Sequence, residues 1–285
     1  MLVRDMRPAS LAEQVGRVCA LDGAVLDRMR HEALTMPNAW VAEYGEFQSG
    51  GWWTLSLFNA SGDPADVTIA DCEAVPTSLL ERMPATRALL DGLGLVYMWV
   101  RLARLAPNSF LWEHRDYGEL SEREHYRLHI PLQTNRSAGL VLGGAKVHLA
   151  AGDLWRLVPT NAHGACNLLG PDRIHLILDC YGNDGFAKLA GRSRLDDGDA
   201  VMLPSASDAE LDRHVDDAVR LARLGYTETA ERSLLRLFYR YALPEGRVYD
   251  LLATMHMTLA QPEAARAWQA KKMLMLGTKD EGGRQ

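Results

Sequence analysis

The pattern of apolar and polar positions divides the chain into three zones. Over residues 11–34, apolar residues recur near helical spacing with charged residues between them, which predicts a helix. Over residues 40–179 the pattern changes to short runs rich in aromatic and β-branched residues, separated by turn signals and interrupted by one helical stretch at 77–93. Helical apolar stripes return over residues 208–276, after a small polar stretch at 204–208 that is the best candidate for a linker.

The middle zone predicts a fold made mainly of β-strands. Short strands at near-regular spacing, without an alternating βαβ pattern, favour a sandwich or jelly roll over a doubly wound sheet. We therefore expect a helical segment at 1–39, a β core at 40–190 and an all-α C-terminal domain at 205–285. The strands predicted in the core are 52–58, 97–105, 126–133, 139–141, 146–149, 153–157, 163–167 and 174–180.

Composition and charge narrow the class of protein. The chain has 285 residues, of which 47% are hydrophobic and 24% charged, so it can bury a sizeable core and is not disordered as a whole. A formal net charge of -6 provides no basic field for a phosphate backbone, so we expect no nucleic-acid partner. The longest uncharged apolar stretch spans nine residues at 92–100, whereas a membrane-spanning helix needs about 20.

Cysteine usage and the first residues indicate where we expect the protein to reside. The four cysteines have no C-x-x-C spacing and are too few for a disulfide framework in a chain of this length, which indicates reduced thiols. Charged residues interrupt the start of the sequence before an apolar run of signal-peptide length forms. We therefore expect a cytoplasmic protein with no membrane segment.

A candidate metal site begins with His114 and Asp116. Residues two positions apart in an extended segment point to the same face, so this imidazole and this carboxylate can converge on one ion. For these two residues alone, a surface pair in a loop is the alternative. His163 follows 49 residues after His114, behind a predicted strand, so a strand-rich fold can return it to the same point. Two histidines and one carboxylate hold Fe(II) on one face of its octahedron and leave the other positions open.

Arg173 is a candidate for binding an anion. It lies ten residues after His163, at the start of the apolar strand predicted at 174–180. A guanidinium directed into a barrel is costly unless it meets an anion, and its planar geometry suits a carboxylate. The alternative is a residue at the strand edge that pairs with Asp172 or Asp179. Together with the three candidate metal ligands, Arg173 predicts a metal site with an anionic ligand beside it.

Five stretches of the sequence resemble one known family in both order and spacing. They are His114-Arg-Asp-Tyr117, Arg127-Leu-His-Ile-Pro-Leu-Gln-Thr-Asn135, Gly152-Asp-Leu-Trp155, His163-Gly-Ala-Cys-Asn167 and Asp172-Arg-Ile-His-Leu-Ile-Leu-Asp179. The family is that of the iron- and 2-oxoglutarate-dependent oxygenases of the aspartyl/asparaginyl β-hydroxylase type. Within it, the chain is most similar to the branch typified by L-proline cis-4-hydroxylase, which keeps an aspartate two residues after the first histidine.

This resemblance implies both a fold and a set of site residues. The implied fold is a double-stranded β-helix, a cupin-like jelly roll with flanking helices. Carried over by position, the resemblance implies that His114, Asp116 and His163 are the iron ligands. It implies in addition that Arg173 binds the distal carboxylate of 2-oxoglutarate.

Arg127 and His129 correspond to an Arg-x-His strand that faces the pocket in the family, where cosubstrate and substrate meet. The alternation along this strand supports the placement independently, because residues two positions apart share a face. For His129 the alternative is a core histidine held by hydrogen bonds. The two faces are Arg127, His129 and Pro131 on one side and Leu128, Ile130 and Leu132 on the other.

A substrate carboxylate needs a cation in the pocket. Arg127 is the first candidate for this anchor, and Arg101 or Arg104 is a distant second. The animal enzymes of the family have a hydroxyl where this chain has Ala103, so their second contact to the distal carboxylate of the cosubstrate is absent or supplied differently. We therefore expect Arg173 to carry more of that contact.

Aromatic residues near the first core strand are candidates for an apolar wall of the pocket. Phe47, Trp52 and Trp53 can enclose a ring or apolar side chain of a substrate, and simple strand packing is the alternative. Trp155 is expected in the core.

The leading hypothesis is hydroxylation of a free amino acid, proline or a cyclic relative such as pipecolate, with Fe(II), 2-oxoglutarate and O2. The family's chemistry implies hydrogen abstraction by an iron-oxo group and hydroxyl rebound. A second hypothesis is a hydroxylase of Asp, Asn or Pro in a peptide or a carrier-bound intermediate, and a third is a metal-binding jelly roll without activity. We expect a small-molecule partner, neither nucleic acid nor membrane, and homo-oligomer formation is compatible with the sequence.

Overall fold

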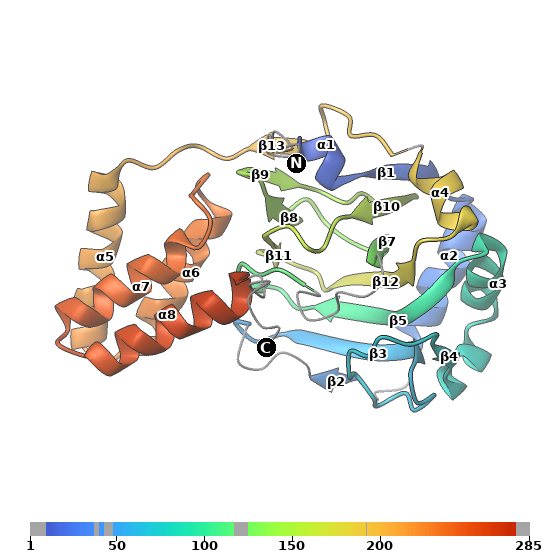
Figure 1. Cartoon of the computed structure of the whole chain (residues 1–285), viewed down its shortest axis with the longest axis horizontal. Coiled ribbons are helices and arrows are strands. Elements are labelled where there is room, and N and C mark those ends of the chain that lie inside the picture. Colours follow the sequence, from blue (N-terminus) through green and yellow to red (C-terminus); the bar gives the residue numbers. More distant parts are fainter. Residues whose placement is uncertain (1–9, 37–39, 43–47, 117–124, 192, 278–285) are drawn as a thin grey trace, which may run out of the picture.

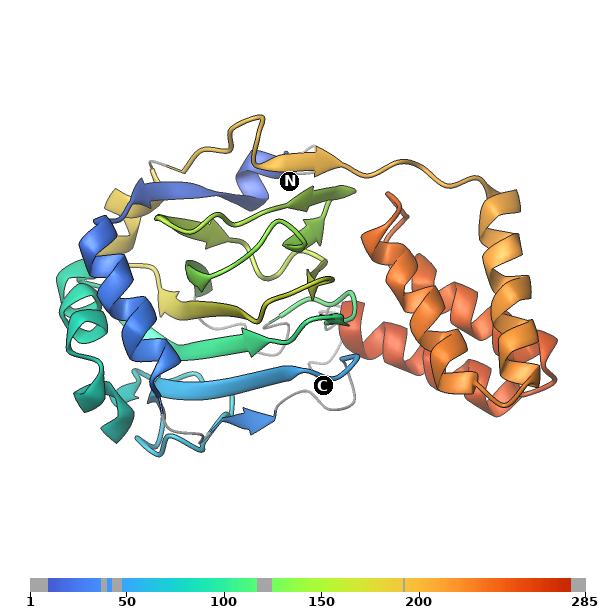
Figure 2. The ribbon, with the colours of Figure 1, turned by 180° about the vertical axis from the view of Figure 1, so that it is seen from behind.

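The computed structural model describes residues 10–36, 40–42, 48–116, 125–191 and 193–277. In this part of the chain, two antiparallel sheets lie beside a separate group of C-terminal helices (Figures 1 and 2). None of the described helices is long and apolar enough to cross a membrane.

The larger sheet has eight strands and contains most of the long ones. Its central strand carries Arg173 at its first position and pairs on both sides with antiparallel neighbours. β4 (Val75–Pro76) pairs with β3 outside the main path. The order along the main path is β1 (Val15–Ala20), β10 (Asp153–Leu157), β7 (His125–Gln133), β12 (Arg173–Tyr181), β5 (Val96–Leu105), β3 (Trp52–Asn59) and β2 (Val41–Ala42).

The smaller sheet has five short strands and packs on the inner face of the larger one. A shared apolar cluster joins the two, with Ala103 and Leu105 from the larger sheet beside Leu140 and Val147 from the smaller one. The functional pocket lies between the two sheets. The strand order is β13 (Ala200–Met202), β9 (Ala145–Val147), β8 (Ala138–Leu142), β11 (His163–Asn167) and β6 (Ser109–Phe110).

The outer face of the larger sheet is covered by α2 (Gly23–Leu34) and α3 (Pro84–Leu93), as Figures 1 and 2 show. Met29 and Leu90 of these helices pack in one buried cluster with Leu128, Ile130 and Leu132 of β7. Arg127 and His129, on the other face of β7, line the pocket, so the alternation predicted for this strand is confirmed at these two residues. A period of two along β7 thus separates an apolar outer face from a functional inner face.

The helical patterns at 77–93 and 208–276 are confirmed. The first contains η1 (Ser78–Arg82) before α3, and Pro84 stands at the first position of α3, where a missing N–H is tolerated. Residues 203–207 form no helix or strand and precede the C-terminal group. The helices that follow the strands are α4 (Asp184–Ala190), α5 (Asp208–Arg223), α6 (Thr227–Leu235), η2 (Arg236–Tyr239), α7 (Arg247–Thr258) and α8 (Pro262–Leu276).

The single helix predicted over residues 11–34 is wrong in its first half. After the short α1 (Leu11–Gln14), the chain forms the edge strand β1, which pairs with β10. Val15 is buried in the cluster between the sheets, and the Arg17 guanidinium donates a hydrogen bond of 3.0 Å to Asp153. These contacts with residues more than a hundred positions away override the local helical spacing. The helix resumes only at α2, where the Asp22 carboxylate accepts from the Val25 N–H.

A close approach of the C-terminal helices to β11 generates a stability prediction. A Cβ atom at Gly164 would lie 2.4 Å from Tyr239 Oη and 2.8 Å from Phe238 Cε1. The tyrosine hydroxyl cannot move freely, because it donates to the Leu111 and Ala165 carbonyls. We expect Gly164→Ala to lower the free energy of unfolding by about 1 to 3 kcal/mol, as measured by urea denaturation.

Gly92→Ala is the matched control for this variant. Gly92 lies within α3, and a Cβ atom there would meet no atom within 4 Å. Alanine in a helix interior is more stable than glycine by about 0.5 to 1 kcal/mol, so this variant should gain stability. Equal effects of the two substitutions would contradict the tight contact at Gly164.

Candidate metal centre and anion pocket

The two histidines predicted as metal ligands face each other across an antiparallel bridge. His114 N donates to His163 O and His163 N donates to His114 O, each at 2.9 Å. The bridge extends the edge of the smaller sheet, because His163 is the first residue of β11. The two imidazole centroids are 4.5 Å apart. The strand-rich fold thus returns His163 to His114 although the two are 49 positions apart in the sequence, as the spacing predicted.

Backbone carbonyls hold both imidazole rings in the orientation a metal needs. His114 Nδ1 lies 2.7 Å from the Trp112 carbonyl, and His163 Nδ1 lies 2.8 Å from the Asn161 carbonyl. A carbonyl accepts, so each Nδ1 carries the proton and each Nε2 presents a lone pair. Burial, followed by the nearby His114, lowers the pKa of His163 to about 3, which keeps this ring neutral at physiological pH.

Asp116 completes the group of candidate ligands. Its Oδ1 lies 3.7 Å from His114 Nε2 and its Oδ2 lies 3.6 Å from His163 Nε2. Burial opposes ionisation of this carboxyl, but the guanidinium charges of Arg127 and, less strongly, Arg101 outweigh it and hold the pKa of Asp116 below its usual value. The backbone N–H of Asp116 also donates to the Pro159 carbonyl at 2.9 Å, which fixes the segment.

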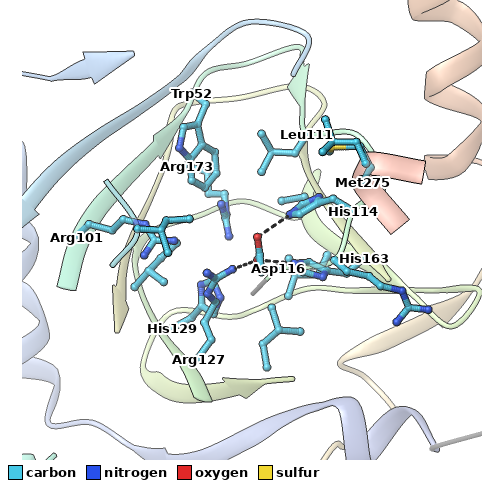
Figure 3. A pocket seen from close by; sticks show the side chains of 17 residues that line it. Trp52, Arg101, Leu111, His114, Asp116, Arg127, His129, His163, Arg173 and Met275 are labelled. Carbon is cyan, nitrogen blue, oxygen red and sulfur yellow. Dashed lines mark hydrogen bonds and ion pairs between the residues drawn. The ribbon is translucent and has the colours of Figure 1, made fainter. Parts of the chain in front are cut away.

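The donor set fits one divalent metal ion. The three ligand atoms lie within 4.8 Å of one another. Ligand atoms about 2.1 Å from a common ion are about 3 to 4 Å apart, so only small side-chain movements would close the site. Two neutral imidazoles and one carboxylate suit a non-haem Fe(II) ion with open coordination positions. Figure 3 shows the three side chains meeting at the centre of the pocket.

Arg173 extends into the same pocket without a carboxylate partner in the described part of the chain. It is 1% exposed, and its Nη1 has no hydrogen-bond partner there. Burial lowers the pKa of Arg173 to about 10, so the guanidinium remains charged at neutral pH. The sequence offered Asp172 and Asp179 as alternative partners for Arg173. Asp179 pairs with Arg101 and Arg127 instead, and Asp172 Oδ2 lies 4.0 Å from Arg104 Nε. A buried cation with an unused N–H fits an anionic ligand.

His129 and His175 lie next to Arg173. Both ring nitrogens of His129 are buried without a hydrogen-bond partner in the described residues, so the alternative of a core histidine held by hydrogen bonds does not apply there. Burial, and then the charges of Arg173 and Arg127, keep the pKa of His129 well below its usual value. His175 Nδ1 lies 2.9 Å from Arg173 Nη2 and therefore accepts from it. His175 thus orients the guanidinium, a role the sequence did not reveal.

Arg127 and Arg101 share the carboxylate of Asp179. Arg127 Nε donates to Asp179 Oδ1 at 2.7 Å, and its Nη1 forms an ion pair with Asp116. Arg101 forms an ion pair with Asp179 and lies 3.8 Å from the centroid of the Trp99 ring. Asp179 is 0% exposed. The first candidate for the substrate anchor, Arg127, therefore lines the pocket but is also the link between Asp179 and the metal site.

Apolar residues from both sheets form the rest of a cavity of about 240 Å³. Trp52 lines it as predicted, whereas Trp53 lies on the other face of its strand, 4.3 Å from Arg104. Arg104 is therefore not in the pocket. Phe47 lies outside the described residues, and Trp155 is buried in the core as expected. The apolar lining from the sheets and their connections is Trp52, Ile69, Leu111, Leu140, Leu157, Ala165 and Ile177.

Leu274 and Met275 at the end of α8 also line the cavity. Sequence reasoning missed both, together with Asp179 and His175. The apolar stripe of α8 carried no signal for the pocket, because it predicts only that the helix packs against something. The sequence did contain a signal for Asp179, because an aspartate in a mostly apolar predicted strand indicates a buried ion pair.

The shared carboxylate of Asp179 generates a second stability prediction. Asp179→Asn leaves two buried guanidiniums with a neutral partner, and breaking a buried ion pair in this way costs about 3 to 5 kcal/mol. We expect a loss of this size in the free energy of unfolding, measured by urea denaturation. Asp217→Asn is the control: it removes a pair with Arg220 in which both side chains are more than 70% exposed, so its effect should stay below about 1 kcal/mol. An unchanged unfolding midpoint in Asp179→Asn would contradict the assigned ion pairs.

Comparison with solved structures finds several oxygenases of low similarity. A Pseudomonas putida prolyl-4-hydroxylase is 15% identical, with a TM-score of 0.41 over 60% of this chain and 93% of that one. A 2OG-Fe(II) oxygenase family oxidoreductase from Burkholderia pseudomallei is 14% identical, with a TM-score of 0.42 over 61% and 82%. Both TM-scores are below 0.5, so the description of the fold rests on the strand order of this chain.

Sequence comparison identifies the family. The chain is 30% identical over 174 residues to L-proline cis-3-hydroxylase 1 of Streptomyces sp, and the alignment covers 58% of each protein. It is 27% identical over 140 residues to L-proline cis-4-hydroxylase of Rhizobium meliloti, and that alignment covers 48% of this chain and 50% of the relative. The chain thus spans little more than half the length of these curated relatives. The family model described as aspartyl/asparaginyl beta-hydroxylase matches residues 25–182. This match includes the three candidate metal ligands and Arg173, and the chain belongs to the aspartyl/asparaginyl β-hydroxylase family.

Proposed function

We propose that this chain is an Fe(II)- and 2-oxoglutarate-dependent hydroxylase of a free amino acid, with proline or a cyclic relative such as pipecolate as substrate and O2 as oxidant. The observation that carries the proposal is the convergence of His114, Asp116 and His163 beside the unused N–H of Arg173. The names of the relatives, which are proline hydroxylases, support the substrate class.

The proposed fold and domain boundaries follow from the same assignment. We infer that the two antiparallel sheets form a jelly roll of the double-stranded β-helix type. Residues 40–190 would be the oxygenase core, to whose larger sheet the segment 1–39 adds the edge strand β1, and 205–285 would be a C-terminal helical domain. The pocket between the sheets supports this inference, because ligands commonly bind in the mouths of such β structures.

Four polar residues of the pocket have a direct role in this proposal. His114, Asp116 and His163 would hold the iron, and Arg173 would hold the far carboxylate of 2-oxoglutarate. When bound, iron and 2-oxoglutarate supply with O2 an oxidant for an unactivated C–H bond. The apolar walls exclude water, and the position of the substrate selects which carbon is hydroxylated. No acid or base is needed at the substrate.

The balance of charge supports a substrate that carries a carboxylate. Arg115 at the pocket is paired with Glu245, and the other three guanidiniums face two carboxylates, which leaves one positive charge. An Fe(II) ion and the 2-oxoglutarate dianion together add no net charge. The remaining guanidinium charge is therefore available to a carboxylate, and an amino acid carries one beside its ammonium group. The charged residues are Arg101, Arg127, Arg173, Asp116 and Asp179.

The size of the cavity favours a free amino acid over a peptide. At about 240 Å³ it is smaller than the roughly 300 to 1,000 Å³ usual for ligand pockets, and it must also hold 2-oxoglutarate. A peptidyl or carrier-bound aspartyl, asparaginyl or prolyl residue remains the second candidate function. A metal-binding jelly roll without activity is the third.

A turnover assay tests the proposed function. The anaerobically purified protein is mixed with Fe(II), 2-oxoglutarate and single amino acids, O2 is admitted, and succinate and products heavier by one oxygen atom are measured. We expect proline or pipecolate to stimulate succinate formation well above the rate without substrate. His163→Ala should abolish it, because a metal site with two ligands no longer holds iron in place.

The outcomes separate the three functions. Stimulation by no free amino acid would overturn the proposal, and stimulation by prolyl or aspartyl peptides alone would favour the second function. A third outcome is that the parent protein binds iron but turns over no substrate, and that His163→Ala loses the iron. This outcome would favour a metal-binding jelly roll without activity.

Arg173 provides an independent test of the cosubstrate site. We expect Arg173→Ala to raise the KM for 2-oxoglutarate by about 10- to 100-fold, because a charge-assisted hydrogen bond contributes about 1.5 to 3 kcal/mol. Fe(II) affinity, measured by isothermal titration calorimetry, should stay close to that of the parent. The KM of Arg173→Lys for 2-oxoglutarate should lie between those of the parent and of Arg173→Ala, since lysine keeps the charge but not the planar pair of donors. Loss of iron binding in Arg173→Ala would show that the residue has a different role.

A further inference from the structure

The end of α8 lies at the edge of the pocket. Leu274 and Met275 line the cavity, and the Met275 carbonyl accepts a hydrogen bond of 2.8 Å from the backbone N–H of Arg115. Arg115 stands between the candidate metal ligands His114 and Asp116 in the sequence. Figure 3 shows Met275 beside Leu111 and His114. The last turn of the C-terminal helices is thus joined directly to the segment that carries two ligands.

Further contacts fix this arrangement. Tyr249 Oη donates to the Glu113 carbonyl at 2.6 Å, and the Gly246 N–H donates to the Glu113 carboxylate at 3.0 Å. The rings of Trp112 and Trp268 pack with centroids 5.1 Å apart. Because residues 112, 113 and 115 all contact the helical group, the end of α8 has a defined position relative to the metal ligands.

The last turn of α8 contains residues that anchor the helix as well as residues that face the pocket, and Met275 does both, because it also packs against the apolar core of the helical group. Leu276 is buried in the apolar core of the helical group, and Lys272 pairs with Asp250 at 2.8 Å. Leu274, by contrast, is 67% exposed although it lines the cavity. Its side chain therefore contributes little to the packing of the helices, and its apolar surface is available to a bound molecule.

The position of this turn assigns it to the substrate rather than the cosubstrate. In Figure 3, Arg173 lies to the left of Asp116 and Met275 to its right, on the side of Leu111 and His114. Under the proposed function, 2-oxoglutarate extends from the metal toward Arg173. The space on the side of Met275 then remains for the substrate, and apolar side chains there suit an apolar ring.

We propose that Leu274 and Met275 form the apolar wall of the substrate subsite and set the largest ring or side chain that the site accepts. This inference rests on the proposed function, because that function places 2-oxoglutarate at the Arg173 end of the pocket. It assigns to the C-terminal helices a direct part in substrate selection, beyond packing against the sheets. The substrate class it favours is an amino acid with a compact apolar ring.

A ring-size series tests the proposal. The substrates are proline, pipecolate and azepane-2-carboxylate, whose rings differ by one methylene each, and kcat/KM is measured with Fe(II), 2-oxoglutarate and O2. One methylene in a closely fitting apolar pocket changes discrimination by about 10- to 200-fold. We expect Leu274→Ala and Met275→Ala to raise the ratio of the seven-membered to the five-membered substrate by at least about 10-fold, with an unchanged KM for 2-oxoglutarate.

Met273→Ala is the matched control. Met273 is the adjacent residue and is 69% exposed, but it does not line the cavity, so its substitution should leave the ratio unchanged. Thermal unfolding of all variants shows whether the fold is retained, which we expect because Leu274 is exposed.

Binding measured without turnover distinguishes failure of this inference from failure of the proposed function. Dissociation constants for the three ring compounds are determined anaerobically with Fe(II) and 2-oxoglutarate, from the fluorescence of Trp52 and the other tryptophans. A shift in relative affinity toward the larger rings in the two variants supports the wall even if no compound is hydroxylated. Unchanged ratios in both variants, or a parent that binds none of the three compounds, would overturn it.

Discussion

The pocket depends on one buried ionic interaction, the carboxylate of Asp179 between two guanidiniums. Removing a carboxylate from water costs several kcal/mol, and only well-placed opposite charges offset that cost. Asp179 lies on the central strand β12, whereas Arg101 and Arg127 lie on its neighbours β5 and β7. The interaction therefore crosses three strands. A slip of one residue would turn Asp179 onto the apolar outer face, so the ion pairs and the apolar cluster specify the same register.

The metal centre is connected to this interaction through Arg127. Its guanidinium contacts Asp179 with one edge and Asp116 with another, so the ligand carboxylate stays ionised inside an apolar pocket. The two histidines are positioned differently, by the backbone bridge that pairs residues 114 and 163 and by carbonyls that accept from each Nδ1. Side-chain electrostatics thus place the carboxylate, and strand geometry places the imidazoles.

The sequence was sufficient for the parts of the site that depend on local patterns. Alternation along β7 predicted that Arg127 and His129 face inward, and the family's motifs indicated the three candidate ligands and Arg173, all of which line the pocket. The strand β1 was missed because its pairing with β10 joins residues far apart in the sequence, whereas helical spacing is a local property. The position of Leu274 was missed for the same reason. The sequence shows an apolar residue near the end of a helix, but only tertiary packing places that helix end beside the pocket.

The two ends of the pocket are built by different means, and this difference has a physical consequence. The charged end lies on long strands with hydrogen-bonded neighbours on both sides, where a substitution disturbs buried charge. The apolar end lies on the last turn of α8, where Leu274 is largely exposed and contributes little to folding. Changes in the size of the Leu274 side chain therefore have little effect on stability, while changes at Asp179 have a large one. A fold arranged in this way can vary the substrate while its metal and anion sites stay constant.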